Sequence, residues 1–394
     1  MKITVPTIDF GTSKIVTMVA QSNGERCDIV GSGAVPYSGY LQDGWNNPDE
    51  IRDVIRTAID QAQKTGNCRI HELNVGVPGM FTRVIVKEVH VSLTGPDPHV
   101  TAQDVRACFK LAEESGGDRI IHSAPAWFRV DDGKKTLSPV GIKGRELSAM
   151  IALVTADKYF IDDITYRLRD MDIEPREFYS TVAGEATYAL SQDERDKTAM
   201  LIDIGYLCTD VMVMEGDALI FHKCLDIGGG HISADIAEQL NIPFPFVEEK
   251  IKQTYSFNST NQDETYVIPA TEDEPARTVR RDEVTPIIEA KVEEIAEDIN
   301  KALEEGGVKL GKWSNVYLTG GGLILNKGGK DFLAGKLHRI IREAQRTNNK
   351  MTSHVFSSAV GLTILVVTTQ EEQKAPEGGA KGLFSRAFRW LMGY

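Results

Sequence analysis

The stretch Ile8-Asp9-Phe10-Gly11-Thr12-Ser13 lies between two apolar runs, Ile3–Ile8 and Lys14–Ala20. Two strands joined so closely through a glycine predict a β-hairpin. The pattern returns about half a chain later, where Leu201-Ile202-Asp203-Ile204-Gly205 precedes Thr209-Asp210 and the apolar run Val211–Met214. We interpret the two stretches as one supersecondary unit used twice.

Both turns carry groups that suit a nucleotide triphosphate and its metal ion. Glycine lets a backbone approach phosphates closely, because no Cβ stands in the way. The first turn supplies N–H groups, hydroxyls and the carboxylate of Asp9, and the second supplies Asp203, Thr209 and Asp210. A third glycine loop, Gly320–Gly322, follows an expected strand and could pass close to a ribose or an α-phosphate. Each signal is weak alone, but the three in this order favour a nucleotide held between two related lobes.

Strands and helices alternate through the rest of the chain, which favours an α/β class with mixed sheets. Apolar residues at helical spacing predict a helix over Pro48–Thr65, and Thr101 with Asp104 predicts a capped helix over Thr101–Glu114. The other expected strands are Leu73–Val77, Val84–Ser92, Ile120–Val130, Ser148–Val154 and Val316–Leu318; the other expected helices are Asp157–Met171, Glu283–Leu303 and Lys330–Glu343. Phe257–Arg281 is polar enough to be a loop or a polar hairpin.

Composition excludes several classes of protein. The chain has 394 residues and a net charge of −13, which argues against a surface dominated by nucleic-acid binding. Its five cysteines form no CxxC or CxxH pair, so metal-ligand spacing is absent and we expect thiols in a reducing cytoplasm. We expect no secretory signal, and no apolar run approaches the roughly 20 residues that span a bilayer.

The last residues predict a peripheral membrane anchor. Thr369–Lys381 has no large apolar side chain and is typical of a flexible linker. On a helical wheel of the segment that follows, bulky apolar residues cover one half and Arg386 and Arg389 lie opposite. Such a helix lies in the membrane interface and favours anionic lipids. The alternative is an ordinary helix that packs on the body or on a partner.

The order of the three glycine loops resembles the superfamily of actin, DnaK-type chaperones and sugar kinases. Three further segments are similar to the FtsA family in particular: Leu225-Asp-Ile-Gly-Gly-Gly-His231-Ile-Ser-Ala-Asp-Ile-Ala-Glu-Gln-Leu240, Glu248-Glu-Lys-Ile-Lys-Gln-Thr-Tyr255, and Ile142-Lys-Gly-Arg145-Glu-Leu147 after Ser138-Pro139-Val-Gly141. The resemblance covers nearly the whole chain, from Ile8 to Tyr394.

The resemblance implies an α/β, actin-like (ribonuclease-H-like) fold of two lobes, with an inserted small α+β domain and a C-terminal amphipathic helix. The expected parts are the first lobe at 1–81, 161–195 and 346–368; the inserted domain at 82–160; the second lobe at 196–226 and 304–345, with its own insertion at 227–303; the linker at 369–381; and the membrane helix at 382–394.

The resemblance also implies ligands and partners. It implies ATP and Mg²⁺, self-association into protofilaments, a tubulin-like FtsZ partner, anionic lipids, and a place on the cytoplasmic face of the bacterial membrane at the division site. The expected phosphate and Mg²⁺ residues are Asp9, Gly11, Thr12, Ser13, Lys14, Asp203, Gly205, Thr209 and Asp210, with Asp9 and Asp203 holding the metal through water. The expected adenosine residues are Gly228, Gly229, Glu249, Lys252, Gly320, Gly321 and Gly322. The expected membrane residues are Leu383, Phe384, Arg386, Phe388, Arg389, Trp390 and Leu391.

The sequence departs from the family pattern in two places. Tyr206 and Leu207 stand in the second phosphate loop where the family usually has glycine. The segment before Ala183 also lacks the acidic residue that many superfamily ATPases carry near Ser180, although Glu185 is close. We therefore expect nucleotide binding with slow or absent hydrolysis, with Asp203 and Glu185 as candidate catalytic residues.

Two other functions stay open at this point. One is a pilus-assembly or cell-shape adaptor of the same fold. The other, less favoured, is a small-molecule kinase of the superfamily, which would need a substrate pocket and a catalytic Asp but no lipid-binding tail.

Overall fold

The computed structural model describes residues 3–373 apart from positions 25, 42–43, 118, 262, 271–274, 312–313 and 345–352. The chain divides into two compact units. The first comprises Met1–Leu201, Met212–His222 and Gln345–Tyr394, and the second comprises Ile202–Val211 and Lys223–Ala344. Among the described residues, no helix is both long and apolar enough to cross a bilayer.

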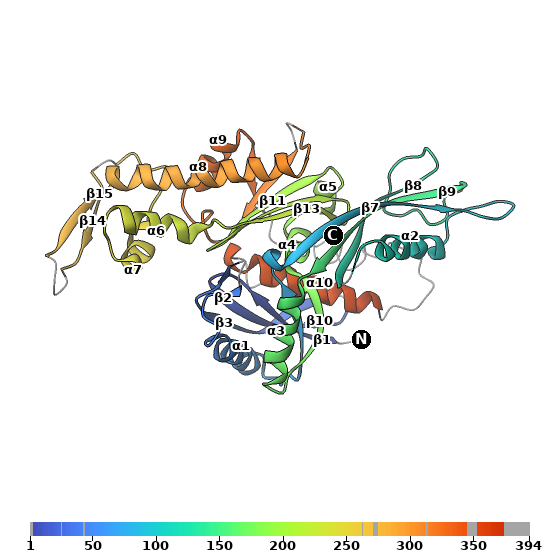
Figure 1. The fold of residues 1–394 in the computed structure, drawn as a ribbon, viewed down its shortest axis with the longest axis horizontal. Coiled ribbons are helices and arrows are strands. Elements are labelled where there is room, and N and C mark those ends of the chain that lie inside the picture. Colours follow the sequence, from blue (N-terminus) through green and yellow to red (C-terminus); the bar gives the residue numbers. More distant parts are fainter. Residues whose placement is uncertain are drawn as a thin grey trace. The chain divides into compact units, whose positions relative to one another are not determined.

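The first unit is built on a five-stranded sheet in the order β3-β2-β1-β6-β10 (Figure 1). Its strands are β1 (Ile3–Phe10), β2 (Lys14–Ser22), β3 (Cys27–Pro36), β6 (Glu72–Val77) and β10 (Glu174–Ser180). β1, β2 and β3 pair antiparallel in succession, whereas β6 pairs parallel with β1 and β10 pairs parallel with β6. The predicted hairpin through Gly11 is confirmed.

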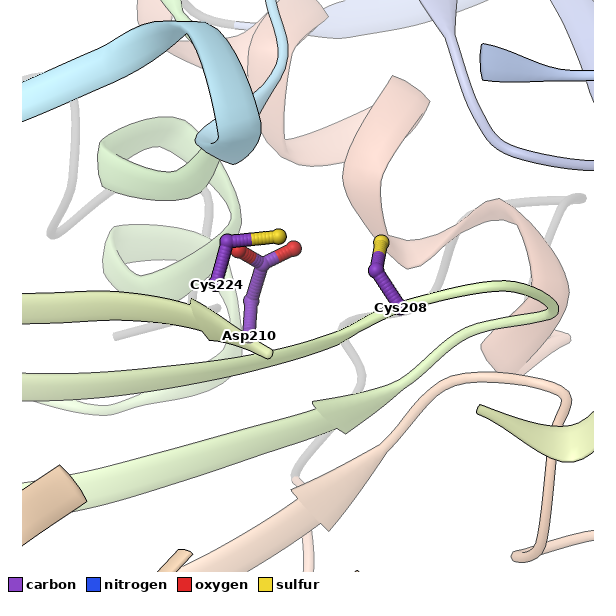
Figure 2. A group of neighbouring side chains, drawn as sticks. All are labelled: Cys208, Asp210 and Cys224. Atoms are coloured by element: carbon purple, nitrogen blue, oxygen red, sulfur yellow. The ribbon is translucent and has the colours of Figure 1, made fainter. Parts of the chain in front are cut away.

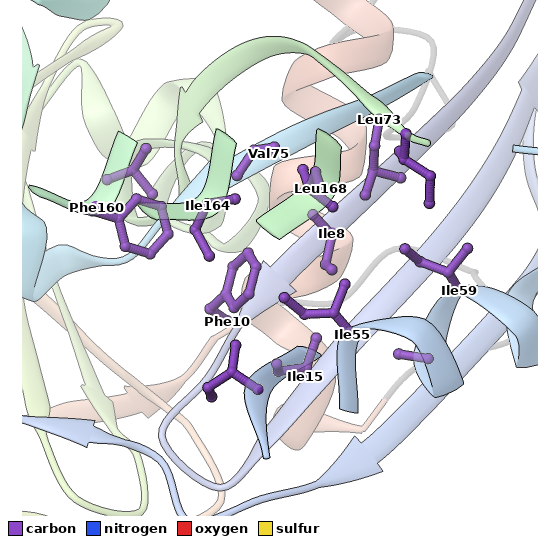
Figure 3. Packing of buried hydrophobic residues seen from close by; sticks show 14 of the residues in the cluster. Ile8, Phe10, Ile15, Ile55, Ile59, Leu73, Val75, Phe160, Ile164 and Leu168 are labelled. Atoms are coloured by element: carbon purple, nitrogen blue, oxygen red, sulfur yellow. The ribbon is translucent and has the colours of Figure 1, made fainter. Parts of the chain in front are cut away.

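Apolar residues of this sheet and two helices form the core of the first unit (Figure 3). Helix α1 (Ile51–Gly66) places Ile55 and Ile59 against Ile8 and Ile15, because residues four apart share one helical face. Helix α3 (Lys158–Arg169), capped by Asp157, contributes Phe160, Ile164 and Leu168. Phe160 stacks on Phe81 at 5.0 Å between ring centroids.

A three-stranded antiparallel sheet, in the order β7-β9-β8, forms a domain inserted into the first unit. Its strands are β7 (Thr82–Ser92), β8 (Ile120–Val130) and β9 (Glu146–Ala156). Helix α2 (Ala102–Glu114) packs on β7 and β9. The predicted capping box is present, since Thr101 and Asp104 each accept a hydrogen bond from the other's backbone N–H.

The second glycine hairpin belongs to a five-stranded sheet in the order β13-β12-β11-β16-β17. Its strands are β11 (Ala199–Ile204), β12 (Thr209–Glu215), β13 (Ala218–Leu225), β16 (Asn315–Thr319) and β17 (Ile341–Glu343). Three strands consecutive in sequence are followed by a later strand and then by one parallel to it, as in the first sheet. The prediction of one supersecondary unit used twice is confirmed.

Three helices of the second unit pack together. α8 (Arg281–Glu305) packs against α6 (Gly229–Gln239) and α9 (Gly329–Leu337). The polar stretch 257–281 contains the antiparallel pair β14 (Thr265–Ile268) and β15 (Arg277–Arg280), as one of the two sequence interpretations expects. The remaining elements are β4 (Tyr40–Leu41), β5 (Gly44–Trp45), α4 (Thr181–Ala189), α5 (Gln192–Arg195), α7 (Phe244–Phe246), α10 (Ser357–Gln373), the 3₁₀ turns Gly79–Phe81 and His354–Phe356, and a π-helical turn at Val247–Lys252.

Two predicted segments differ from the structure. The helix expected over Lys330–Glu343 ends at Leu337, because His338 adopts a left-handed conformation and Ile341 pairs with Val316 in β17. Thr369–Gln373, expected to be part of the linker, instead belongs to α10, where Gln370 is buried and donates to Asn74. The rest of the predicted linker and the predicted membrane helix lie outside the described residues.

Candidate functional site

Asp9 lies at the end of β1, where the first glycine hairpin begins. Its side chain is 4 % exposed, and Oδ2 accepts a hydrogen bond of 2.9 Å from Ser358 Oγ in the first turn of α10. Ser358 is separated from Asp9 by 349 positions, so no local sequence pattern could have identified it. Lys14, at the start of β2, places its Nζ 5.3 Å from the ring centroid of Phe356.

The other oxygen of Asp9, Oδ1, is buried and has no hydrogen-bond partner among the described residues. Burial raises the pKa of Asp9 from its ordinary value of 3.8 to about 6, against the lowering effects of the Ser358 hydrogen bond and the Lys14 charge. A buried carboxylate is unfavourable for folding unless something binds it. Carboxylate oxygens and water are what Mg²⁺ prefers, so this residue fits the predicted role of holding a hydrated cation.

The carbonyl groups of the first loop are bonded by tyrosines from the segment after β3. Tyr40 Oη donates to the carbonyl of Phe10 at 3.1 Å, and Tyr37 Oη donates to that of Gly11 at 2.8 Å. The Tyr37 N–H donates to the carbonyl of Ser13 at 3.2 Å, and the Gly11 N–H closes the turn on Lys14 at 3.1 Å. Because N–H and C=O of a trans peptide point in opposite directions, these bonds turn the Thr12 N–H away from Tyr37.

The second loop has the same turn but different donors. The Gly205 N–H donates to the carbonyl of Cys208 at 2.9 Å, three residues on, as Gly11 does to Lys14. The loop carbonyls of Ile204, Gly205 and Tyr206 accept from glycine N–H groups. Their donors are Gly322 at 2.7 Å, Gly229 at 2.9 Å and Gly230 at 2.7 Å, respectively.

Close approach explains the glycines of the second loop. A Cβ on Gly229 would lie 2.4 Å from Gly322 Cα. Gly320 has φ +87°, and a Cβ there would lie 2.0 Å from Asp203 Oδ1. A residue with a Cβ would clash at Gly229, and at Gly320 it would also be strained by the positive φ. The structure therefore joins three of the predicted elements: the Asp203 loop, the triple glycine and the start of α6.

The start of α6 has little capacity left for an anion. Helix N-termini bind anions through their first N–H groups, but those of Gly229 and Gly230 are bonded to the second loop. The Gly228 N–H donates to His231 Nδ1 at 3.0 Å. His231 therefore caps the helix, and Gly228 and Gly229 offer backbone surface rather than N–H donors.

Lys252 lies on the π-helical turn and is 8 % exposed. Its Nζ lies 3.4 Å from Glu248 Oε1 and 5.9 Å from the ring centroid of Tyr206. Burial lowers the pKa of Lys252, opposed by Glu248. Glu248 makes the ion pair with Lys252, whereas the neighbouring Glu249, expected at the adenosine together with Lys252, is exposed. π-Helical turns often mark functional sites.

The remaining predicted residues are distributed over both units. Thr12 is buried and Ser13 half-buried in the first loop, while Gly321 is half-buried beside Gly322. Thr209 Oγ1 donates to the carbonyl of Ile227 at 2.7 Å, so that hydroxyl holds the segment just after β13. Of the two candidate catalytic residues, Asp203 belongs to the second unit and Glu185 to the first.

Glu185 lies on α4, where it is 2 % exposed. α4 packs closely on α10, since a Cβ on Gly361 would lie 2.5 Å from Glu185 Cα. The same helix α10 carries Ser358, so the helix that holds Glu185 packs on the helix that supplies the hydrogen-bond partner of Asp9. The seven predicted membrane residues from Leu383 to Leu391 lie outside the described residues.

Comparison with known proteins identifies relatives of the whole chain. A family model described as cell division protein FtsA matches residues 200–374, and one described as an SHS2 domain inserted in FTSA matches residues 79–155. Together they span more than half of the chain. Cell division protein FtsA of Pseudomonas aeruginosa is 24 % identical, over 98 % of this chain and 97 % of the relative. The Bacillus subtilis protein of that name is 26 % identical, over 76 % and 70 %.

Solved structures show the same architecture. The PilM-PilN type IV pilus biogenesis complex aligns at a TM-score of 0.61 and 16 % identity, covering 93 % of this chain and 99 % of that one. MreB5 of Spiroplasma citri bound to ADP aligns at 0.55 and 11 % identity, covering 95 % and 99 %. At such identities the likeness shows the fold alone. The predicted fold class, actin-like α/β with an inserted small domain, is confirmed.

Proposed function

The chain belongs to the FtsA family of cell-division proteins, and we propose that it is an ATP-binding adaptor that attaches a tubulin-like FtsZ partner to the membrane. The proposal includes self-association into protofilaments and a place on the cytoplasmic face of the membrane at the division site. Its supporting observation is the buried Asp9 carboxylate, whose Oδ1 lacks a hydrogen-bond partner among the described residues.

Nucleotide binding is supported separately in each unit. In the first unit, Asp9 would hold Mg²⁺ through water, and Gly11, Thr12 and Ser13 would bind phosphate. In the second unit, Gly320–Gly322, Lys252 and Tyr206 would bind the adenosine, and Asp203 is the repeat's counterpart of Asp9. MreB5 of Spiroplasma citri, which shares the fold, has structures titled as bound to ADP and to AMPPNP. When bound, Mg²⁺ would neutralise phosphate charge.

Slow or absent hydrolysis is part of the proposal. Tyr206 and Leu207 occupy the second loop, and the Tyr206 ring lies beside both Gly230 and Lys252. A side chain at this place limits how closely the loop backbone can approach a phosphate. We expect turnover well below the roughly 10 s⁻¹ of a median enzyme.

Calorimetric titration of the full chain with ATP, with Mg²⁺ and then with EDTA, tests nucleotide binding. We expect Mg²⁺-dependent affinity that Asp9→Asn weakens by at least about tenfold, the effect of 1.4 kcal/mol. Asp53→Asn, an exposed carboxylate on α1, is the matched control and should bind as the wild type does. Equal ATP affinities for the Asp9 variant and the wild type would show that Asp9 takes no part in nucleotide binding.

Co-sedimentation with liposomes tests membrane attachment. The full chain should pellet with anionic vesicles and less with neutral ones, and deletion of residues 382–394 should release it. A second pelleting assay with the C-terminal peptide of an FtsZ-like protein tests the partner. Unchanged pelleting of the truncated chain, or no peptide binding, would contradict the respective part of the proposal.

A further inference from the structure

Two cysteines and an aspartate gather beside the second glycine loop (Figure 2). The ligand atoms of Cys208, Asp210 and Cys224 all lie within 4.8 Å of one another. Their side chains extend to the same side of neighbouring strands. Cys208 is 7 % exposed, and the other two are half-buried.

The backbone around these residues is held in place. The Cys208 carbonyl accepts the Gly205 N–H at 2.9 Å, which closes the turn, and Thr209 Oγ1 donates to the Ile227 carbonyl at 2.7 Å. A Cβ on Gly228 would lie 2.9 Å from Cys208 N, so the segment after β13 packs directly on the residue that precedes β12. The side chains are therefore brought together by the strand pairing itself.

The sequence carries a signal for this cluster that is different from a CxxC motif. Cys208-Thr209-Asp210 and Cys224-Leu225-Asp226 are two Cys-x-Asp pairs. Residues two apart share a face of a strand, and β12 and β13 are neighbours in the sheet. Two such pairs at the ends of adjacent strands can therefore meet although 16 positions separate the cysteines.

We propose that Cys208, Cys224 and Asp210 bind a thiophilic divalent cation, Zn²⁺ being the best match, with one coordination position open. Zn–S bonds of about 2.3 Å and Zn–O bonds of about 2.1 Å in a tetrahedron require ligand separations of roughly 3.5–3.8 Å. The observed limit of 4.8 Å is about one ångström larger, which small side-chain rotations can close. Two thiolates select Zn²⁺ over Mg²⁺ or Ca²⁺, which prefer oxygen ligands only.

Charge at the cluster favours a cation. The Cys208 hydrogen bond, burial and the nearby Asp210 and Asp226 raise the pKa of the Cys224 thiol. Zn²⁺ binds thiolates, so binding of the ion releases protons from the cysteines. The cluster also gives Asp210 a place different from its predicted role at the phosphates or Mg²⁺. The ion would fasten the second loop to β13 independently of nucleotide binding.

Titration of the reduced, metal-free full chain with Zn²⁺, and with Co²⁺ as a spectroscopic probe, tests this site. We expect one ion per chain and a thiolate-to-cobalt charge-transfer band. Cys208→Ser and Cys224→Ser should each weaken Zn²⁺ affinity by more than about tenfold and reduce the charge-transfer band. Loss of a residue that only hydrogen-bonds to a metal ligand already weakens metal affinity by about 10–100-fold. Asp210→Asn should weaken binding with the thiolate band retained. Cys68→Ser, a half-buried thiol of the first unit, is the matched control.

Alkylation of the wild-type chain provides a second measurement that no folding defect can confuse. Zn²⁺ should protect Cys208 and Cys224 from a thiol reagent, with no change at Cys68. Zn²⁺ binding that both serine variants retain, a lack of protection, or a Cys208–Cys224 disulfide in place of a metal would overturn the proposal. ATP titration of the same samples reports separately on the proposed function.

Discussion

The two glycine loops share one backbone plan but satisfy it with different groups. In both loops, the glycine N–H donates to the carbonyl of the residue three positions later. Other carbonyls of each loop accept hydrogen bonds from outside the loop. In the first loop the donors are mainly side-chain hydroxyls of Tyr37 and Tyr40. In the second they are backbone N–H groups of Gly229, Gly230 and Gly322. A backbone donor requires close approach, whereas a tyrosine bridges a larger gap.

The cations proposed at the two loops also differ. In the first loop, the buried Asp9 Oδ1 makes no hydrogen bond with a described residue, and we propose a hydrated cation there. Beside the second loop, the proposed cation lies at a separate cluster of Cys208, Asp210 and Cys224. Under the proposed function, the first loop keeps a destabilising buried carboxylate for a cation, whereas the second loop is held together by its own packing. Three experiments test this difference between the two loops.

The largest effect is expected at Gly320 of the second loop. Gly320→Ala forces an ordinary residue to φ +87° and brings a Cβ to 2.0 Å from Asp203 Oδ1. The strain costs about 1–2 kcal/mol and the clash about 1–3 kcal/mol more. Denaturant unfolding should show this loss. Gly335→Ala, on α9 with open space around it, should be neutral or slightly stabilising. Equal effects at both positions would contradict close packing of the second loop.

A smaller effect, with a distinctive pH dependence, is expected at Asp9. Folding raises its pKa from 3.8 to about 6, so between these values the folded state binds more protons and stability falls as the pH rises. Asp9→Asn removes this fall. Between about pH 4.5 and pH 7.5, the stability of the wild type relative to the variant should drop by about 2 kcal/mol. Parallel stability–pH curves for the two proteins would show that Asp9 is not a strained carboxylate.

The smallest effect is expected at the tyrosines of the first loop. Tyr37→Phe removes the donor to the Gly11 carbonyl and Tyr40→Phe the donor to the Phe10 carbonyl, each at a cost of about 1 kcal/mol. Thermal unfolding of the single and double variants would measure it. Tyr166→Phe, an exposed tyrosine on α3, serves as the control. A loss of stability as large as that of Gly320→Ala would mean that the tyrosine donors of the first loop matter as much for stability as the close backbone packing of the second.

Local patterns predicted the parts of the molecule that local forces determine. Apolar spacing identified α1, Thr101 and Asp104 identified the start of α2, and the repeated Ile-Asp-x-Gly identified both hairpins. The end of α9 was missed because Ile341 continues an apolar pattern, although its pairing with Val316 makes it a strand. The ion pair of Lys252 with Glu248 depends on the π-helical turn at Val247–Lys252, which no sequence pattern indicates.

Contacts between residues far apart in the chain could not be predicted from local sequence patterns. Ser358 reaches Asp9 from the far end of the chain, and Tyr37 and Tyr40 reach the first loop from a segment with no recognisable motif. The Cys-x-Asp pairs were present in the sequence, but their meeting depends on the adjacency of β12 and β13. Sequence reasoning located the loops, and tertiary packing determines which groups complete them.

The most direct test of Asp9 as the group that holds the nucleotide's cation is the pH dependence of ATP binding in the presence of Mg²⁺. Binding needs the ionised carboxylate, whose pKa is raised to about 6. The ATP affinity of the wild type, measured by calorimetry, should therefore be about tenfold weaker at pH 5 than at pH 7.5. This ratio is corrected by the ratio that Asp9→Asn shows between the same two pH values. An identical pH dependence for wild type and variant would contradict the account.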